Sequence, residues 1–194
     1  MEDEPHEINQ YLNTLPDYVE TIQLQRRNLK ELPDLSRFNK LHTLLLDYNQ
    51  IKNLPDLSIF PNLKKLSISC NQLEKLPDLS NCKNLQEINV FKNNLKHLPQ
   101  LCKLLQLRKL SCGHNSLHEL PYMESMHNLL YLSCPFNLLS EIPTLPKNLK
   151  HFNCNFNYIS SLPKLPEYLF ELRCSDNHIR TMPEFTHHLQ KLNA

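Results

Sequence analysis

A single glycine, Gly113, and no tryptophan occur among the 194 residues. Phosphate-cradling loops and the dinucleotide-binding fingerprint need several glycines, because the backbone there approaches its ligand at positions that have no Cβ atom. One glycine cannot supply such a loop. The sequence therefore excludes these two classes of nucleotide-binding enzyme.

The sequence also lacks a dominant charge and long apolar runs. Its formal net charge is +1, with acidic and basic residues interspersed, whereas nucleic-acid-binding proteins usually carry a basic patch. No apolar run reaches the roughly 20 residues of a membrane span. The N-terminal segment MEDEPHEINQ is acidic and has no apolar core, unlike a signal peptide. We expect no nucleic acid and no membrane among its partners, and a cytoplasmic, intracellular location.

Seven cysteines occur, an odd number, and most follow one another at spacings of 20 or 22 residues. Small secreted domains instead pair an even number of cysteines into a disulfide framework. The cysteine pattern therefore agrees with an intracellular location.

The dominant positive feature is an internal repeat, represented by residues 63–77, LKKLSISCNQLEKLP. Its first part has the spacing L-x-x-L-x-L, Asn71 follows, and a Leu-Pro pair closes it. The first apolar position recurs at steps of 22 residues and then of 20, at Val19, Leu41, Leu63, Leu85, Leu107, Leu129, Leu149, Leu169 and Leu189. Four further apolar positions recur in the same register, and the equivalent positions of successive repeats form a column. Such self-similarity predicts a solenoid of stacked repeats.

The alternation within L-x-L predicts a short strand in each repeat, with leucines inward and the intervening residues outward. Stacking then gives a curved α/β solenoid, a horseshoe with one parallel β-sheet on its concave wall. Return segments such as LPDLSIFPNL allow a short helical or 3₁₀ turn. The shorter IPTLPKNL and LPKLPEYL, with paired prolines, favour an extended path. Seven asparagines share one column, and we expect each to satisfy buried loop backbone groups.

Residues 1–18 are predicted to form an N-terminal cap, a short helix followed by half a repeat. Residues 19–194 are predicted to form a single domain of eight full repeats and a truncated ninth. The last segment stops at Ala194, midway through a predicted strand. An uncovered edge strand is prone to pair with another chain, so self-association through the C-terminal edge is one hypothesis.

The repeats resemble those of the leucine-rich repeat family from about Leu12 to Ala194. The rhythm L-P-x-L-P-x-x-L-x-x-L-x-C-x-x-N-x-L of residues 143–183 is similar to repeats of secreted bacterial effectors and of giant DNA virus proteins. This resemblance implies protein–protein recognition on the concave face, usually without catalysis. For a viral protein or an effector it implies action in the host cytoplasm.

Four cysteines are the most prominent candidates for chemistry: Cys112, Cys134, Cys154 and Cys174. They occupy the last apolar position of the L-x-x-L-x-L spacing, which forms the third apolar column. Neighbouring strands lie about 4.8 Å apart, and a straight column of sulfurs suits a tetrahedral zinc site poorly. Because leucine, isoleucine and valine occupy the same column in earlier repeats, we interpret these cysteines as apolar packing. Cys82 is expected inside as well, and Cys70 and Cys102 nearer the surface.

No catalytic, metal-binding or cofactor-binding residue is therefore predicted, and we do not expect an enzyme. The resemblance to effectors implies one further candidate, because some of them carry a separate ubiquitin-ligase domain with a Cys-x-Asp nucleophile. The sequence Cys174-Ser-Asp176 matches this pattern. However, Cys174 occupies an inward position, where a thiol is inert.

The outward strand positions of repeats four to eight, together with the position that follows them, carry the candidate binding residues. Aromatic side chains surrounded by polar groups form typical binding hot spots. The predicted partner-binding residues are Phe91, Lys109, His114, Tyr131, Phe136, His151, Phe156 and Arg173. For Phe136 and Phe156, packing against adjacent repeats is an equally good interpretation.

The function predicted from the sequence is a non-enzymatic scaffold that binds a protein or peptide on its concave face. The alternative is a structural or assembly subunit that docks through its C-terminal edge strand. The identity of the partner does not follow from the sequence.

Overall fold

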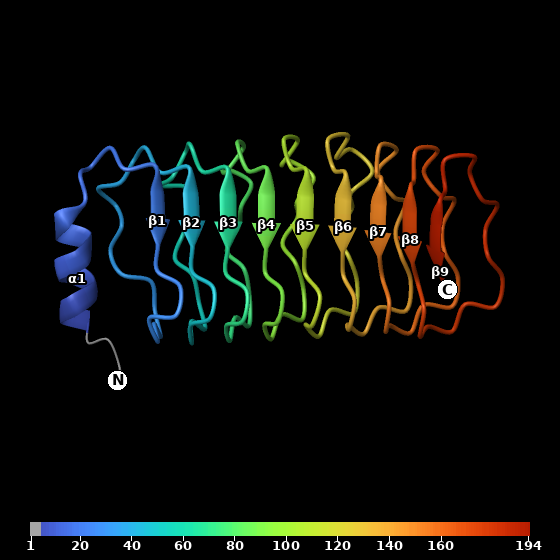
Figure 1. The fold of residues 1–194 in the computed structure, drawn as a ribbon, viewed down its shortest axis with the longest axis horizontal. Helices are drawn as coiled ribbons and strands as arrows, with labels where there is room; N and C mark the ends of the chain where they lie inside the picture. The colour runs from blue at the N-terminus through green and yellow to red at the C-terminus, as the bar shows by residue number, and fades with distance from the viewer. Residues whose placement is uncertain (1–4) are drawn as a thin grey trace.

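The computed structural model describes residues 5–194 and shows a solenoid of nine parallel strands preceded by one helix (Figure 1). Residues 1–4 of the predicted cap lie outside the described residues. The elements are α1 (Pro5–Thr14), β1 (Thr21–Gln23), β2 (Thr43–Leu45), β3 (Lys65–Ser67), β4 (Glu87–Asn89), β5 (Lys109–Ser111), β6 (Tyr131–Ser133), β7 (His151–Asn153), β8 (Glu171–Arg173) and β9 (Lys191–Asn193). The strands pair in sequence order, so the predicted solenoid with one parallel sheet is confirmed.

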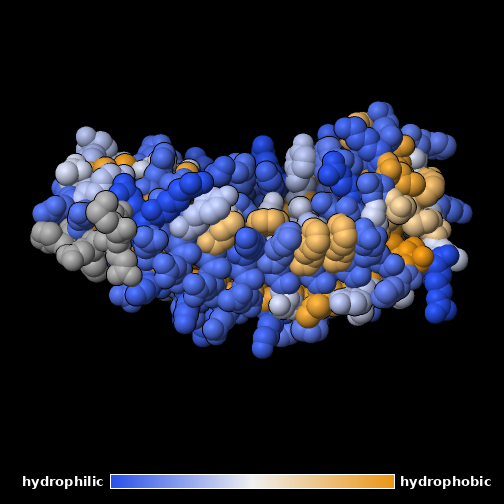
Figure 2. Space-filling model, turned by 60° about the horizontal axis from the view of Figure 1, so that its bottom comes forward, coloured by the Kyte–Doolittle hydropathy of each residue, from blue (hydrophilic) through white to orange (hydrophobic). Residues whose placement is uncertain are grey.

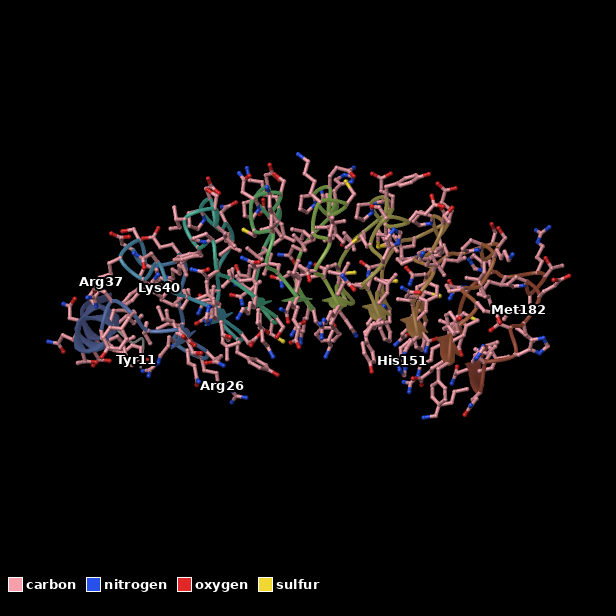
Figure 3. The ribbon with its side chains drawn as sticks, turned by 90° about the horizontal axis from the view of Figure 1, so that it is seen from above. Tyr11, Arg26, Arg37, Lys40, His151 and Met182 are labelled. Atoms are coloured by element: carbon pink, nitrogen blue, oxygen red, sulfur yellow. The ribbon has the colours of Figure 1, made fainter. Side chains whose placement is uncertain are left out.

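The middle residue of each strand from β1 to β8 is buried in the core, as the L-x-L alternation predicts. Ile22, Leu44 and Leu66 are fully buried, and the pairing register places them side by side. The two flanking residues of each strand point away from the core. Figure 3 shows the strands along the concave wall and the return segments along the convex wall. The core is therefore a continuous layer of stacked apolar columns between the two walls.

The return segments contain turns closed by bonds between residues three apart, without a continuous 3₁₀-helix. In the 22-residue repeats two such bonds follow one another, as from Phe60 N–H to Leu57 C=O (3.0 Å) and from Leu63 N–H to Phe60 C=O (3.1 Å). The return segments with paired prolines keep one, as from Leu149 N–H to Pro146 C=O (3.1 Å). These return segments thus have one turn fewer, and the residue that would donate the missing bond is a proline, Pro146 or Pro166, which has no N–H.

The asparagine column joins neighbouring repeats. The side-chain oxygen of Asn93 accepts a hydrogen bond from Leu73 N–H at 2.9 Å, in the preceding repeat. Its amide nitrogen donates to Ile68 C=O (2.9 Å) and to Val90 C=O (3.1 Å). Asn49, Asn71, Asn115, Asn137, Asn157 and Asn177 make the equivalent contacts. The predicted role of this column in satisfying loop backbone groups is confirmed.

The residue before each of these asparagines adopts a left-handed backbone conformation. Its φ is 59° at Tyr48, 52° at His114, 54° at Phe136 and 55° at Phe156. Such a conformation is costly for a residue with a Cβ atom. Hydrogen bonds to the next repeat stabilise it here, such as Phe136 N–H to Asn155 C=O at 3.0 Å. The repeat thereby holds the residue before each asparagine at the same place on the surface.

The two ends of the solenoid differ. Ile8 and Leu12 of α1 belong to the buried core, and the Arg37 guanidinium donates to Leu12 C=O at 2.6 Å. At the other end, Leu192 of β9 is 47% exposed, whereas Leu172 of β8 is fully buried. Within residues 5–194 no helix has the length and apolar character that crossing a membrane requires.

Candidate functional site

The eight predicted binding residues fall into two groups on the surface. One group is a row of rings where the strands end, which we call the ring row: Phe91, His114, Phe136 and Phe156. The other group lines a hollow on the concave sheet, the concave hollow: Lys109, Tyr131, His151 and Arg173. The structure thus brings the residues together as two sets of four.

The ring row is continuous. Ring centroids are 4.8 Å apart from Phe91 to His114, 4.1 Å from His114 to Phe136, and 4.2 Å from Phe136 to Phe156. Phe136 and Phe156 remain 42% and 43% exposed, and Phe91 is half-buried. Figure 2 shows apolar surface in a row on this face of the middle repeats. The predicted packing of Phe136 and Phe156 against neighbouring repeats is therefore present, and because both rings are partly exposed, their role in binding stays a prediction.

The concave hollow has a volume of about 310 Å³ and spans β5 to β8. The Tyr131 and His151 rings form one wall, with centroids 4.4 Å apart and an interplanar angle of 5°. Figure 3 shows His151 on the concave side of the sheet. Tyr131 is 43% exposed, so much of this aromatic surface faces the solvent. The hollow thus combines a fixed aromatic wall with polar strand residues such as Ser133 and Asn153.

An ion-pair network fixes the far side of the concave hollow. Glu171 Oε2 lies 3.1 Å from His151 Nδ1, and Glu171 Oε1 accepts a hydrogen bond of 2.8 Å from Arg173 Nε. These bonds hold the pKa of the Glu171 carboxyl below its ordinary value of 4.5, with the bond from His151 as the largest cause and that from Arg173 the next. The Glu171 side chain is only 17% exposed. The carboxylate is therefore held in place by the side chains of His151 and Arg173.

Lys109 lies at the opposite end of the concave hollow and has no ion-pair partner among residues 5–194. Its cross-strand neighbour Glu87 pairs with Lys65 at 3.0 Å. Lys109 therefore presents an uncompensated positive charge beside Tyr131. A ligand with an anionic group next to an apolar one would match this end of the hollow.

Glu171 is not among the binding residues predicted from the sequence. The signal was available, because Glu171 directly opposes His151 in the pairing register and opposite charges across strands attract. Phe170 is a second such residue: its ring lies 5.7 Å from that of His151. Residues just before a strand have no fixed inward or outward position in the alternation, so this contact could not be predicted.

The cysteine column is buried, as the sequence indicates. Cys112, Cys134, Cys154 and Cys174 are at most 3% exposed, and Cys70 and Cys102 are half-buried. Burial raises the pKa of the Cys112 thiol to about 12 and that of Cys82 to about 11. Because the thiolate is the reactive form, these thiols are poor nucleophiles and poor metal ligands at neutral pH. Within residues 5–194 there is no group of three histidine, cysteine or acidic side chains placed to hold a metal ion.

Comparison with known proteins supports the repeat assignment. A family model described as "Leucine Rich repeats (2 copies)" matches residues 61–103. No curated protein sequence matches the chain significantly.

Solved structures match over almost the whole chain. YopM from Yersinia enterocolitica WA-314 superposes with a TM-score of 0.90 and 30% identity, over 99% of this chain and 42% of YopM. A leucine-rich repeat protein of Leptospira interrogans has a TM-score of 0.81 and 25% identity, over 95% of this chain and 56% of its own. A Shigella effector leucine-rich repeat domain has a TM-score of 0.79 and 28% identity, over 93% and 79% of the two chains.

The chain therefore spans about half the length, or less, of the first two of these structures. The similarity covers the repeats themselves, from the strand columns to the return segments. The family match, the identity to effector repeats and the nine-stranded solenoid together show that this chain is a leucine-rich repeat protein with repeats like those of bacterial effectors.

Proposed function

We propose that this protein is a non-enzymatic scaffold that binds a protein or peptide partner in the concave hollow. Leucine-rich repeat solenoids typically use their extended concave surface for protein–protein interaction. The observation that carries the proposal is the stacked pair Tyr131 and His151 in a hollow bounded by Lys109 and Arg173. An aromatic anchor with charged neighbours is the usual composition of a binding hot spot.

Rigidity supports the same proposal. Tyr131 is held against His151, and Glu171 holds both His151 and Arg173. Side chains that are already ordered lose little conformational entropy when a partner binds, so more of the contact energy remains as affinity. The ring row lies beside this surface and extends it toward the ends of the strands.

The test begins by placing a photo-crosslinking amino acid at position 131, or at position 122 as a control. Tyr122 is also exposed, at 63%, but lies on a return segment. The crosslinked partner is identified by mass spectrometry, and its affinity is measured against the Tyr131→Ala, Phe91→Ala and Tyr122→Ala variants. We expect Tyr131→Ala to weaken binding by roughly tenfold or more, as for a hot-spot residue, with an unchanged melting temperature.

Equal crosslinking at both positions, or a Tyr131→Ala variant that keeps full affinity, would contradict a concave site. The Phe91→Ala variant distinguishes binding in the concave hollow from binding at the ring row, because it changes the ring row alone. A loss with Phe91→Ala but not with Tyr131→Ala would assign the partner to the ring row.

Assembly through the β9 edge is a second candidate function. Leu192 of β9 and Phe185 of the preceding return segment are 47% and 52% exposed, and Figure 2 shows apolar surface gathered at this end of the solenoid. A parallel sheet edge with apolar flanks favours pairing with another chain. Light scattering over a range of concentrations tests it: self-association abolished by Leu192→Pro supports assembly, and a monomer at all concentrations contradicts it.

We also propose a reducing compartment, the cytoplasm, as the place of action, and the host cytoplasm if the protein is an effector. All seven cysteines are free in the structure. Fractionation of cells producing a tagged chain would test this location.

A further inference from the structure

A second hollow, of about 320 Å³, lies on the flank of the solenoid where the strands begin. We call it the flank hollow. Arg108, Leu130 and Lys150 line it from the positions just before β5, β6 and β7, and His127 and Tyr168 line it from return segments. It shares no lining residue with the concave hollow.

The flank hollow is basic, and none of its lining residues is acidic. Among the described residues, neither the Arg108 guanidinium nor the Lys150 ammonium has an ion-pair partner. The equivalent positions of the first two repeats show the contrast, because there Glu20 and His42 form a pair of 3.1 Å. The nearby Glu167 lies 3.6 Å from His188 and is engaged there. Two positive charges therefore remain available around one small hollow.

The backbone beneath these charges is fixed. The carbonyl oxygen of Arg108 accepts hydrogen bonds from Leu130 N–H (2.9 Å) and Tyr131 N–H (3.1 Å). The carbonyl oxygen of Leu130 accepts bonds from Lys150 N–H and His151 N–H, both at 3.0 Å. These bonds connect three successive repeats, so Arg108 and Lys150 are held on opposite sides of Leu130.

Two asparagine side chains also line the flank hollow. Asn128 Nδ2 donates to Leu105 C=O and Asn148 Nδ2 donates to His127 C=O, each at 2.8 Å. These two bonds fix the asparagine side chains that line the hollow. Tyr168 stands at one side, 54% exposed, with its ring centroid 5.1 Å from that of His188.

We propose that the flank hollow binds the phosphate group of a phosphorylated protein segment. Arginine matches a phosphate with two parallel N–H donors, and lysine adds a point charge. His127 and the Tyr168 hydroxyl supply further polar contacts, and Leu130 and the Tyr168 ring contact the apolar part of the residue that carries the phosphate. A monoester dianion matches two uncompensated cations better than a single carboxylate does.

The test is an NMR titration that follows the side-chain signals of His127 and Tyr168. Three probes are used: inorganic phosphate, a short capped peptide with one phosphoserine, and the same peptide with serine. The variant Arg108→Gln/Lys150→Gln removes both charges and keeps polar side chains. Its matched control is Lys64→Gln/Lys83→Gln, which removes the same charge from earlier repeats, outside the hollow; Lys64 occupies the same repeat position as Arg108.

We expect saturable shifts with the phosphoserine peptide, weaker ones with inorganic phosphate and none with the serine peptide. The Arg108→Gln/Lys150→Gln variant should bind the phosphopeptide roughly tenfold or more weakly, because each bond to a charged group is strong. The control variant should bind it normally. An absence of saturable shifts, equal affinity for inorganic phosphate, or an equal loss in the control variant would each overturn the proposal. Tyr131→Ala should leave this titration unchanged, so the result is independent of the concave site.

Discussion

Gly113 lies against Pro135 of the next repeat so closely that a side chain has no room between them. A Cβ atom added to Gly113 would lie 2.7 Å from Cδ of the Pro135 ring and 2.9 Å from the Pro135 carbonyl oxygen. The backbone of Gly113 does not adopt a positive φ, so close approach, and not backbone conformation, requires the one glycine of the chain.

Gly113→Ala should therefore destabilise the protein by about 1–3 kcal/mol, the usual cost of overpacking. Replacing Pro135 by alanine as well should recover only part of this loss, because the carbonyl oxygen stays in place. Urea denaturation of the two single variants and the double variant measures the coupling. A Gly113→Ala variant as stable as the parent protein would show that the repeats separate easily here.

Asn93 and Asn94 form a natural matched pair, since the first is buried and the second exposed. Asn93→Ala leaves the buried Leu73 N–H without its side-chain partner, and it removes one of the two side-chain donors to the carbonyl groups of Ile68 and Val90, which Asn71 and Asn115 also reach. We expect a loss of at least about 2 kcal/mol, given the cost of orphaned buried polar groups. Asn94→Ala should change the free energy of unfolding by no more than about 0.5 kcal/mol, as for a surface substitution. Similar losses in both variants would argue against the asparagine column as the inter-repeat link.

Glu171 should make the stability of the concave hollow depend on pH. Its pKa is lowered in the folded state because His151 and Arg173 donate hydrogen bonds to the carboxylate. Because the pKa of Glu171 is lower in the folded state, its ionised carboxylate stabilises the fold at pH values above the ordinary pKa of 4.5. This stabilisation is lost as the pH falls through the lowered pKa. Glu171→Gln should thus lower the melting temperature near neutral pH, and the difference should shrink in acid. The exposed Glu141→Gln is the control, and a pH-independent difference for Glu171→Gln would refute the network.

The cysteines should differ in their reactivity with iodoacetamide. Cys70 and Cys102 are half-buried and should be alkylated in the native protein. Cys112, Cys134 and Cys174 should react only after unfolding, because burial raises the pKa of their thiols and blocks access. Peptide mass spectrometry at successive times measures the rates. Rapid native labelling of Cys134 would show that the column opens.

We propose that α1 caps the solenoid, because Ile8 and Leu12 cover the end of the core. Leu12→Ala should cost about 2–5 kcal/mol, as for other buried leucines. The exposed Asn9→Ala in the same helix is its control. Stability in a solenoid is a sum of neighbouring terms, so hydrogen exchange should accelerate in the first repeats and not near β8. Unchanged exchange around β1 would argue against a cap.

The position of each candidate residue along its repeat could be predicted, but the contacts of its side chain could not. Phe91 and His114 occupy different positions of their repeats, yet their rings meet at 4.8 Å. The flank hollow was missed for a related reason. Its two cations lie two repeats apart in the chain, at positions that no strand alternation assigns to a face.

The sequence by itself determined the number, order and register of the strands, the buried columns and the role of the asparagines. These features follow from periodicity, because equivalent residues of stacked repeats must lie about 4.8 Å apart. Only the tertiary structure decided that Tyr131 stacks on His151, that Glu171 binds Arg173, and that Arg108 and Lys150 line one hollow. Those contacts depend on side-chain rotamers, which the column spacing does not encode.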